Sequence, residues 1–172
     1  PQLSCEVQQN VPMVCTATSQ GMQFSLKDTT PTTESTKLSH ELWDLVSNVE
    51  FPTSQRRNAP GQGLCAGTSC VPKQPKVPFL RRLTDDQKEL TRNLNTIISN
   101  LTKGKFHWSS LQINFNTQAR EHTDSNNDGP SLVISEGAHT GGEFYVKVHK
   151  DAEPQLQPIN GIPIITDGRI LH

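Results

Sequence analysis

The sequence predicts a mostly-β domain, an antiparallel β-sandwich or jelly roll, with one or two packing helices. Three observations lead to this fold class. Over residues 106–172, short segments recur in which apolar and polar residues alternate or apolar residues run together. Gly, Asn and Asp residues separate these segments, and one strongly amphipathic helix precedes them. Residues 1–78 have a low-complexity composition with one short helical pattern near residues 39–49. We therefore divide the chain into a loosely ordered N-terminal region, 1–78, and a helix plus β-core, 79–172.

The strongest helical pattern covers residues 83–104. Thr84 is a suitable N-cap, and Gln87 follows it at the spacing of a capping box. Apolar residues recur at helical spacing along one face: Leu83, Leu90, Leu94, Ile97, Ile98 and Leu101. Gly104 suits the C-terminal cap. The apolar face needs a partner surface, most simply a sheet.

The strand predictions follow from alternation with a period of two residues. Residues 106–116 place one set of side chains, Leu111, Ile113 and Phe115, opposite another set, Gln112, Asn114 and Asn116. Residues 131–137 form a short apolar run, residues 142–150 alternate again, and residues 161–171 supply one more strand or two short ones. Residues 51–78 are rich in Pro, Gly and Gln and are predicted to be a loop or linker.

Composition and charge exclude several classes of protein. The net charge of −1 and the pI of about 6.7 provide no basic surface for nucleic acid or an anionic membrane. No segment reaches transmembrane length, and no signal peptide is expected. Because the chain starts at Pro1, we interpret it as a fragment or a processed product.

Four cysteines, at positions 5, 15, 65 and 70, do not have the spacing of a zinc site. Both disulfides and free thiols are compatible with an even count, and we favour free thiols in a reducing compartment. The expected location is intracellular, either cytoplasmic or nuclear.

His122 and Asp124 are the candidate metal ligands. They are two residues apart, so on a strand their side chains project from the same face. With a second imidazole they would form the facial triad of non-haem Fe(II) oxygenases. A His-x-Asp sequence arises by chance in roughly one chain in four of this composition. The alternative is a hydrogen-bonded pair at a strand edge, beside a turn.

The segment "LQINFNTQAREHTDSNNDGPSLVISEGAHTGGEFYV", residues 111–146, resembles the core of 2-oxoglutarate- and Fe(II)-dependent dioxygenases. In particular, it is similar to the TET/JBP-like or related protist and algal branch. The shared features are the order and spacing of a strand, His-x-Asp, an Asn-Asn-x-Gly-x-Ser turn, an apolar strand and Thr-Gly-Gly-Glu. The resemblance covers about residues 106–172 with the helix before them, and leaves the N-terminal third uncovered.

This resemblance implies a double-stranded β-helix that holds Fe(II), with His122 and Asp124 as two ligands. The third ligand is His172 or, because "DGRILH" resembles the phrase before that ligand, a histidine beyond residue 172. The jelly roll is expected to be incomplete at the C-terminus. The basic residue that binds 2-oxoglutarate, which the resemblance implies about ten residues after the distal histidine, is expected beyond residue 172. Asn114 and Tyr145 are candidates for binding the co-substrate; the alternatives are a solvated polar residue and a packing residue.

The expected activity is hydroxylation of an unidentified substrate with 2-oxoglutarate and O2 as co-substrates. A nucleobase is one candidate substrate, although the net charge does not support binding to a duplex. The first alternative is a non-catalytic jelly-roll module for binding or structure that lacks a full metal triad. The second is a cupin-like metal protein with a different cofactor. A histidine within metal reach of the His122–Asp124 pair favours a metal centre over the non-catalytic module.

Overall fold

The computed structural model describes residues 3–8, 15–18, 21–24, 33–54, 59–70, 78–117, 119–124, 129–138, 140, 143–147, 149–157 and 159–172. The side chains of residues before 37 and of residues 70 and 78 are outside this description. So are residues 125–128, 141 and 142, which belong to the turn motifs of the predicted dioxygenase core, and residue 148, which belongs to a predicted strand.

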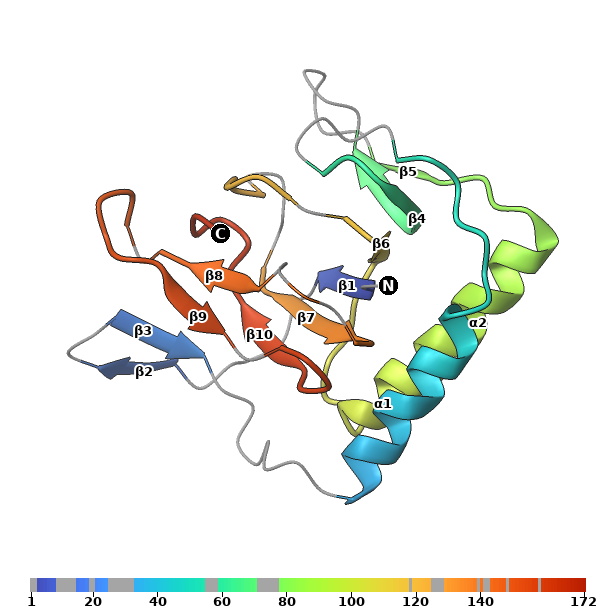
Figure 1. Ribbon diagram of the computed structural model, residues 1–172, viewed down its shortest axis with the longest axis horizontal. Coiled ribbons are helices and arrows are strands. Elements are labelled where there is room, and N and C mark those ends of the chain that lie inside the picture. Colours follow the sequence, from blue (N-terminus) through green and yellow to red (C-terminus); the bar gives the residue numbers. More distant parts are fainter. Residues whose placement is uncertain are drawn as a thin grey trace.

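Most of the described strands belong to one antiparallel sheet (Figure 1). The elements along the chain are β1 (Leu3–Gln8), β2 (Cys15–Thr18), β3 (Gly21–Phe24), α1 (Thr33–Val46), β4 (Gln62–Cys70), β5 (Pro78–Leu80), α2 (Asp85–Leu101), β6 (Ser110–Phe115), β7 (Ser131–Glu136), β8 (Phe144–Val146), β9 (Gln155–Gln157) and β10 (Ile164–Thr166). The six-stranded sheet has the order β10-β7-β1-β6-β4-β5, while β2 pairs with β3 and β8 pairs with β9.

Helix α2 confirms the predicted capping box. The Thr84 hydroxyl accepts from the Gln87 N–H at 3.3 Å, and the Gln87 side-chain oxygen accepts from the Thr84 N–H at 3.1 Å. At the other end, the Gly104 N–H donates to the Ser99 carbonyl at 2.8 Å. Lys103 takes the first left-handed position, with φ of 52°, and Gly104 follows with φ of 66°. The glycine thus lies one residue after the first left-handed position of the cap.

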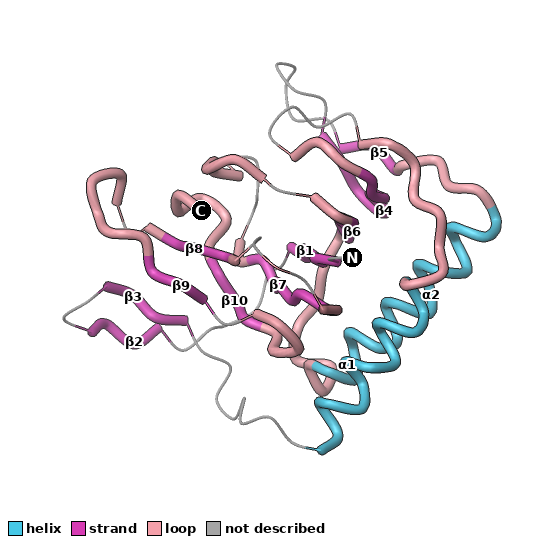
Figure 2. The backbone as a smooth tube through the Cα atoms, in the orientation of Figure 1, coloured by secondary structure: helices cyan, strands magenta, loops and turns pink. Residues whose placement is uncertain are grey.

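Both helices pack on one face of the six-stranded sheet, where they form the hydrophobic core (Figures 1 and 2). The core residues include Leu42, Val46, Leu64, Leu90, Leu94, Ile98, Phe106, Leu111, Ile113, Leu132 and Ile134. The alternation predicted for β6 is confirmed, because Leu111 and Ile113 are buried in this core and Phe115 packs against it. Trp108 also ties this region to α2, donating from Nε1 to the Asn95 side chain at 2.9 Å.

Strand β7 is buried on both of its faces, since all six of its residues are buried. Leu132 and Ile134 point toward the helices, and alternation places Ser131, Val133 and Ser135 on the other face. In Figure 1 the two helices lie on one side of β7, and β8, β9 and the C-terminus lie on its other side. At β7 the six-stranded sheet is therefore covered on both faces.

Over the residues that the structure describes, it confirms a mostly-β arrangement with two packing helices, and the described strands form no closed barrel. The helical pattern near residues 39–49 belongs to α1, which begins earlier, at Thr33. The loop predicted for residues 51–78 is wrong in part, because β4 forms there. Gly63 and Gly67 remove the side-chain alternation by which a strand is recognised in sequence.

The six-stranded sheet takes strands from both sides of the predicted boundary after residue 78. Strand β1, from the N-terminal region, lies between β6 and β7. Neither of the described helices combines the length and the apolar character needed to cross a bilayer. Among the described cysteine side chains, Cys65 is a half-buried free thiol.

Candidate metal centre

Two segments far apart in the chain bring the predicted ligands together. His122 and Asp124 lie in the segment that follows β6, and His172 lies in the segment that follows β10. The His122 N–H donates to the His172 carbonyl at 2.7 Å, and the His172 N–H donates to the His122 carbonyl at 2.9 Å. Two residues that exchange both backbone bonds form a hydrogen-bonded pair, as in an antiparallel ladder. The Asp124 N–H extends the contact by donating to the Gly168 carbonyl at 2.7 Å.

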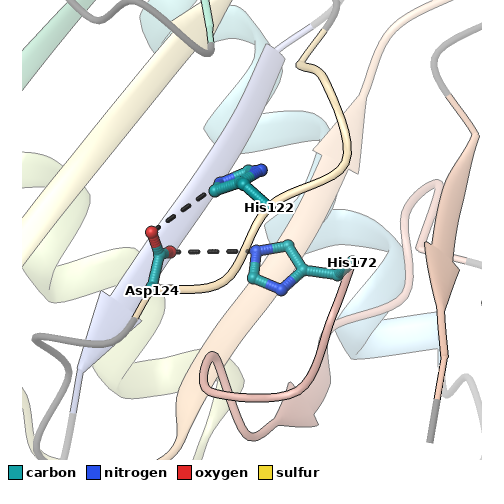
Figure 3. A group of neighbouring side chains, drawn as sticks. All are labelled: His122, Asp124 and His172. Atoms are coloured by element: carbon teal, nitrogen blue, oxygen red, sulfur yellow. Dashed lines mark ion pairs between the residues drawn. The ribbon is translucent and has the colours of Figure 1, made fainter. Parts of the chain in front are cut away.

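The three side chains converge beside this backbone pairing (Figure 3). His122 Nε2 lies 3.7 Å from Asp124 Oδ1, and His172 Nε2 lies 3.8 Å from Asp124 Oδ2. The two imidazole rings are 4.5 Å apart between centroids. The three potential ligand atoms all lie within 4.8 Å of one another, and the side chains are only 8–18% exposed. The group is thus partly shielded from water.

Both histidines are held in the same tautomer by the backbone carbonyl of the residue two positions earlier. His122 Nδ1 lies 2.7 Å from the Arg120 carbonyl oxygen, and His172 Nδ1 lies 2.8 Å from the Ile170 carbonyl oxygen. Because a carbonyl oxygen only accepts, each Nδ1 carries a proton. In the neutral imidazole the Nε2 lone pair is then available to a metal ion, on the side that faces Asp124.

A tight turn fixes the segment that leads to His172. The Asp167 carboxylate accepts from the Arg169 side chain at 2.8 and 2.7 Å and from the Arg169 backbone N–H at 3.0 Å. The hydrogen bond from the Arg169 side chain is the main cause that lowers the pKa of Asp167 below its ordinary value. The Ile170 N–H closes the turn by donating to the Asp167 carbonyl at 3.0 Å.

Strand β8 borders the same segment on its other side. The Lys147 N–H, just after β8, donates to the Leu171 carbonyl at 2.8 Å, and these two residues form an antiparallel bridge. The Phe144 ring lies 5.6 Å from the His172 ring between centroids. Backbone hydrogen bonds therefore order four segments as β9, β8, 170–172 and 122–124.

Asn114 and Tyr145, the predicted co-substrate residues, lie on strands β6 and β8. Asn114 is half-buried on β6, on the side opposite the core residue Ile113, and accepts from Gln112 Nε2 at 3.1 Å. Tyr145 is 44% exposed, and it follows Phe144, so its side chain projects from the opposite face of β8. Their role toward a co-substrate stays a prediction.

The sequence reasoning missed three contributors to the centre. Two are the carbonyl groups of Arg120 and Ile170, which leave no side-chain signal because every residue carries a carbonyl. The third is the ring of Phe144, which belongs to an alternating strand whose contact with His172 depends on the tertiary fold.

The His122, Asp124 and His172 group has the donor set of a two-histidine, one-carboxylate metal centre. The chain matches no protein-family model, no curated protein and no solved structure. A functional assignment therefore depends on the geometry of this group and on the motif order in the sequence.

Proposed function

We propose that the chain is part of an Fe(II)- and 2-oxoglutarate-dependent oxygenase that hydroxylates its substrate, with iron held by His122, Asp124 and His172. The observation that carries the proposal is the convergence of one nitrogen from each of two imidazoles and one carboxylate oxygen, all within 4.8 Å of one another. Three protein ligands of this kind leave positions open for a co-substrate and O2, which is the donor set typical of non-haem Fe(II) oxygenases.

The distances within the group are compatible with a divalent ion. Imidazole and carboxylate ligands lie about 2.0–2.2 Å from such an ion, so neighbouring ligands on an octahedron are about 3 Å apart. The separations of 3.7 Å for His122–Asp124 and 3.8 Å for His172–Asp124 run to different carboxylate oxygens and exceed this value by less than about 1 Å. The two imidazole nitrogens lie within 4.8 Å of each other, so their excess is below about 2 Å. Small side-chain rotations close that difference, because the backbone pairing already sets the register.

The chain's own groups prepare the centre for this chemistry. When bound, iron and 2-oxoglutarate supply an oxidation in which O2 is consumed, 2-oxoglutarate is decarboxylated to succinate, and one oxygen atom enters a C–H bond of the substrate. The Asp124 carboxylate offsets part of the ion's charge. The Nδ1–H groups of His122 and His172 remain bonded to carbonyls, which fixes both rings. The Phe144 ring against His172 adds an apolar neighbour to the centre.

A double-stranded β-helix is the fold that we propose around this centre. Its support is the hydrogen-bonded order of β9, β8, 170–172 and 122–124 as a second layer beside the six-stranded sheet. The non-catalytic jelly-roll alternative has no full set of ligands, so the position of His172 favours the metal centre. The net charge of −1 still gives no support for a nucleic-acid duplex as substrate.

Formation of succinate tests the proposal. The protein is loaded anaerobically with Fe(II) and 2-oxoglutarate and then exposed to O2, and succinate is quantified over time. We expect slow succinate formation by the wild type, and none above background for His172→Ala or Asp124→Ala. The control is His149→Ala, which removes an exposed histidine on the segment after β8 and is expected to keep the wild-type rate.

A wild-type protein that binds divalent metal but forms no succinate would refute the oxygenase proposal and leave the metal centre in place. This distinction is needed because the same donor set binds several divalent ions.

A further inference from the structure

We infer that the ion pair between Glu121 and Lys147 positions the candidate metal ligands, an inference that rests on the metal centre of the proposed function. Lys147 Nζ lies 2.6 Å from Glu121 Oε2. Glu121 immediately precedes His122, and Lys147 is bonded through its backbone to Leu171, which immediately precedes His172. Glu121 is thus the chain neighbour of one ligand, and Lys147 is hydrogen-bonded to the chain neighbour of another.

The ion pair spans the segment that carries His172. That segment is bonded on one side to His122 and on the other side to Lys147. Neighbouring strands are about 4.8 Å apart, so the two outer segments are separated by about 9.6 Å. Two long side chains such as Glu121 and Lys147 are needed to bridge this distance. Their contact therefore closes the three segments into one unit.

The pair lies behind the ligands and not among them. Glu121 stands at a bend immediately before His122 and is not a member of the converging ligand group, although glutamate carboxylates are among the groups that could join it. Leu171 and His172 are successive residues of an extended segment, so Leu171 projects away from the side of His172, and Lys147 faces Leu171 across the bridge. Glu121 and Lys147 are accordingly positioning residues, because they fix the spacing of the ligand segments without belonging to the ligand group.

Partial burial makes the contact more specific than an ordinary surface pair. The Lys147 side chain is 21% exposed, while Glu121 is 53% exposed. Fully exposed ion pairs contribute little, because water screens them and long side chains lose freedom when they meet. A lysine with most of its length covered has already lost much of that freedom, so less entropy opposes the contact.

Cobalt binding by single and double variants tests the inference. The dissociation constant for Co(II) is measured by titration of the visible absorption bands for the wild type, Lys147→Met, Glu121→Gln and the charge-exchanged double variant Glu121→Lys/Lys147→Glu. We expect each single variant to weaken Co(II) binding roughly fivefold, the upper range for such pairs. The charge-exchanged variant is expected to return to within about twofold of the wild type, because it restores the contact.

The direction of the Lys147→Met effect separates positioning from simple electrostatics. If the two charges acted only through their fields, removal of the Lys147 cation would tighten the binding of a metal cation, and removal of the Glu121 anion would weaken it. A positioning role weakens binding in both variants. The matched control is Lys88→Met, which breaks the exposed 2.8 Å ion pair with Asp85 at the start of α2 and is expected to leave Co(II) affinity unchanged.

Each outcome has a defined consequence. Single variants that bind Co(II) as tightly as the wild type, opposite effects of the two single variants, or a failure of the charge-exchanged variant to recover would overturn the inference while the metal centre stands. A wild type that binds no Co(II) overturns both the metal centre and this inference. A wild type that binds Co(II) but forms no succinate with Fe(II) and 2-oxoglutarate removes only the oxygenase activity.

Discussion

Substitution of Gly63 by alanine is expected to disrupt the pairing of β4 with β6. Gly63 lies opposite Asn114 in this pairing, and an added Cβ atom would lie 2.3 Å from the carbonyl oxygen of Ile113. That oxygen also accepts a hydrogen bond from Gln112 Nε2 at 2.9 Å. The new methyl group therefore meets backbone that is held in place by the sheet, and not the end of a flexible side chain.

The size of the effect follows from this contact. A carbon atom needs roughly 1 Å more separation from the oxygen, which forces β4 and β6 apart, and overpacking of this kind costs about 1–3 kcal/mol. Loss of the Gln112–Ile113 hydrogen bond adds about 1 kcal/mol. We expect Gly63→Ala to lower the free energy of unfolding by about 2–4 kcal/mol, measured by urea denaturation with the slope of the transition held in common.

Gly104→Ala provides the contrast. Nothing lies within 4 Å of a Cβ atom there, so its cost comes only from the positive φ of 66°. That cost is about 1 kcal/mol. If Gly63→Ala destabilises the protein by less than Gly104→Ala, the close approach of β4 to β6 is not a feature of the folded chain.

Three further substitutions test the two helices and their contacts with the sheet. Burial is the main cause that raises the pKa of Glu136 in the folded protein above its ordinary value of 4.5. The stability that the Glu136 carboxyl contributes is therefore present below its pKa in the unfolded chain, and it is lost as the pH rises through its pKa in the folded protein. Glu136→Gln keeps an acceptor for the Ser39 hydroxyl and is expected to show a flatter dependence of unfolding free energy on pH; an unchanged slope would refute this. Thr84→Ala removes the N-cap of α2 and is expected to cost about 1 kcal/mol in urea denaturation, whereas no loss would place the cap outside the stable helix. Ile98→Ala empties a position that is 0% exposed and is expected to cost about 3–4 kcal/mol, and a cost below about 1 kcal/mol would contradict its burial between α2 and the sheet.

Local signals in the sequence predicted the elements whose stability is local. The capping box at Thr84 and the period-two pattern at Leu111 and Ile113 each act within one element, and both are confirmed. Strand β4 escaped prediction because Gly63 is required by the close approach of Ile113, and that requirement exists only in the folded sheet. The central place of β1 depends likewise on distant partners, β6 and β7.

The candidate site shows the same division. His122 and Asp124 were recognisable because their spacing is local, whereas the choice between His172 and a later histidine depends on the register between two distant segments. The paired backbone bonds of His122 and His172 set a register that places His172 Nε2 3.8 Å from the Asp124 carboxylate. The Arg120 and Ile170 carbonyls that orient the two rings cannot be distinguished in a sequence from any other carbonyl.

The metal centre is tested most directly by titrating the metal-free protein with Co(II). Binding is monitored by calorimetry and visible absorption for the wild type, His172→Ala and His149→Ala. If His122, Asp124 and His172 form one metal centre, the wild type and His149→Ala bind one equivalent with the same affinity. Loss of a ligand is at least as severe as loss of the groups that orient it, so His172→Ala is expected to bind at least about 10–100-fold more weakly. A His172→Ala protein that binds Co(II) with wild-type affinity and an unchanged spectrum would contradict the account.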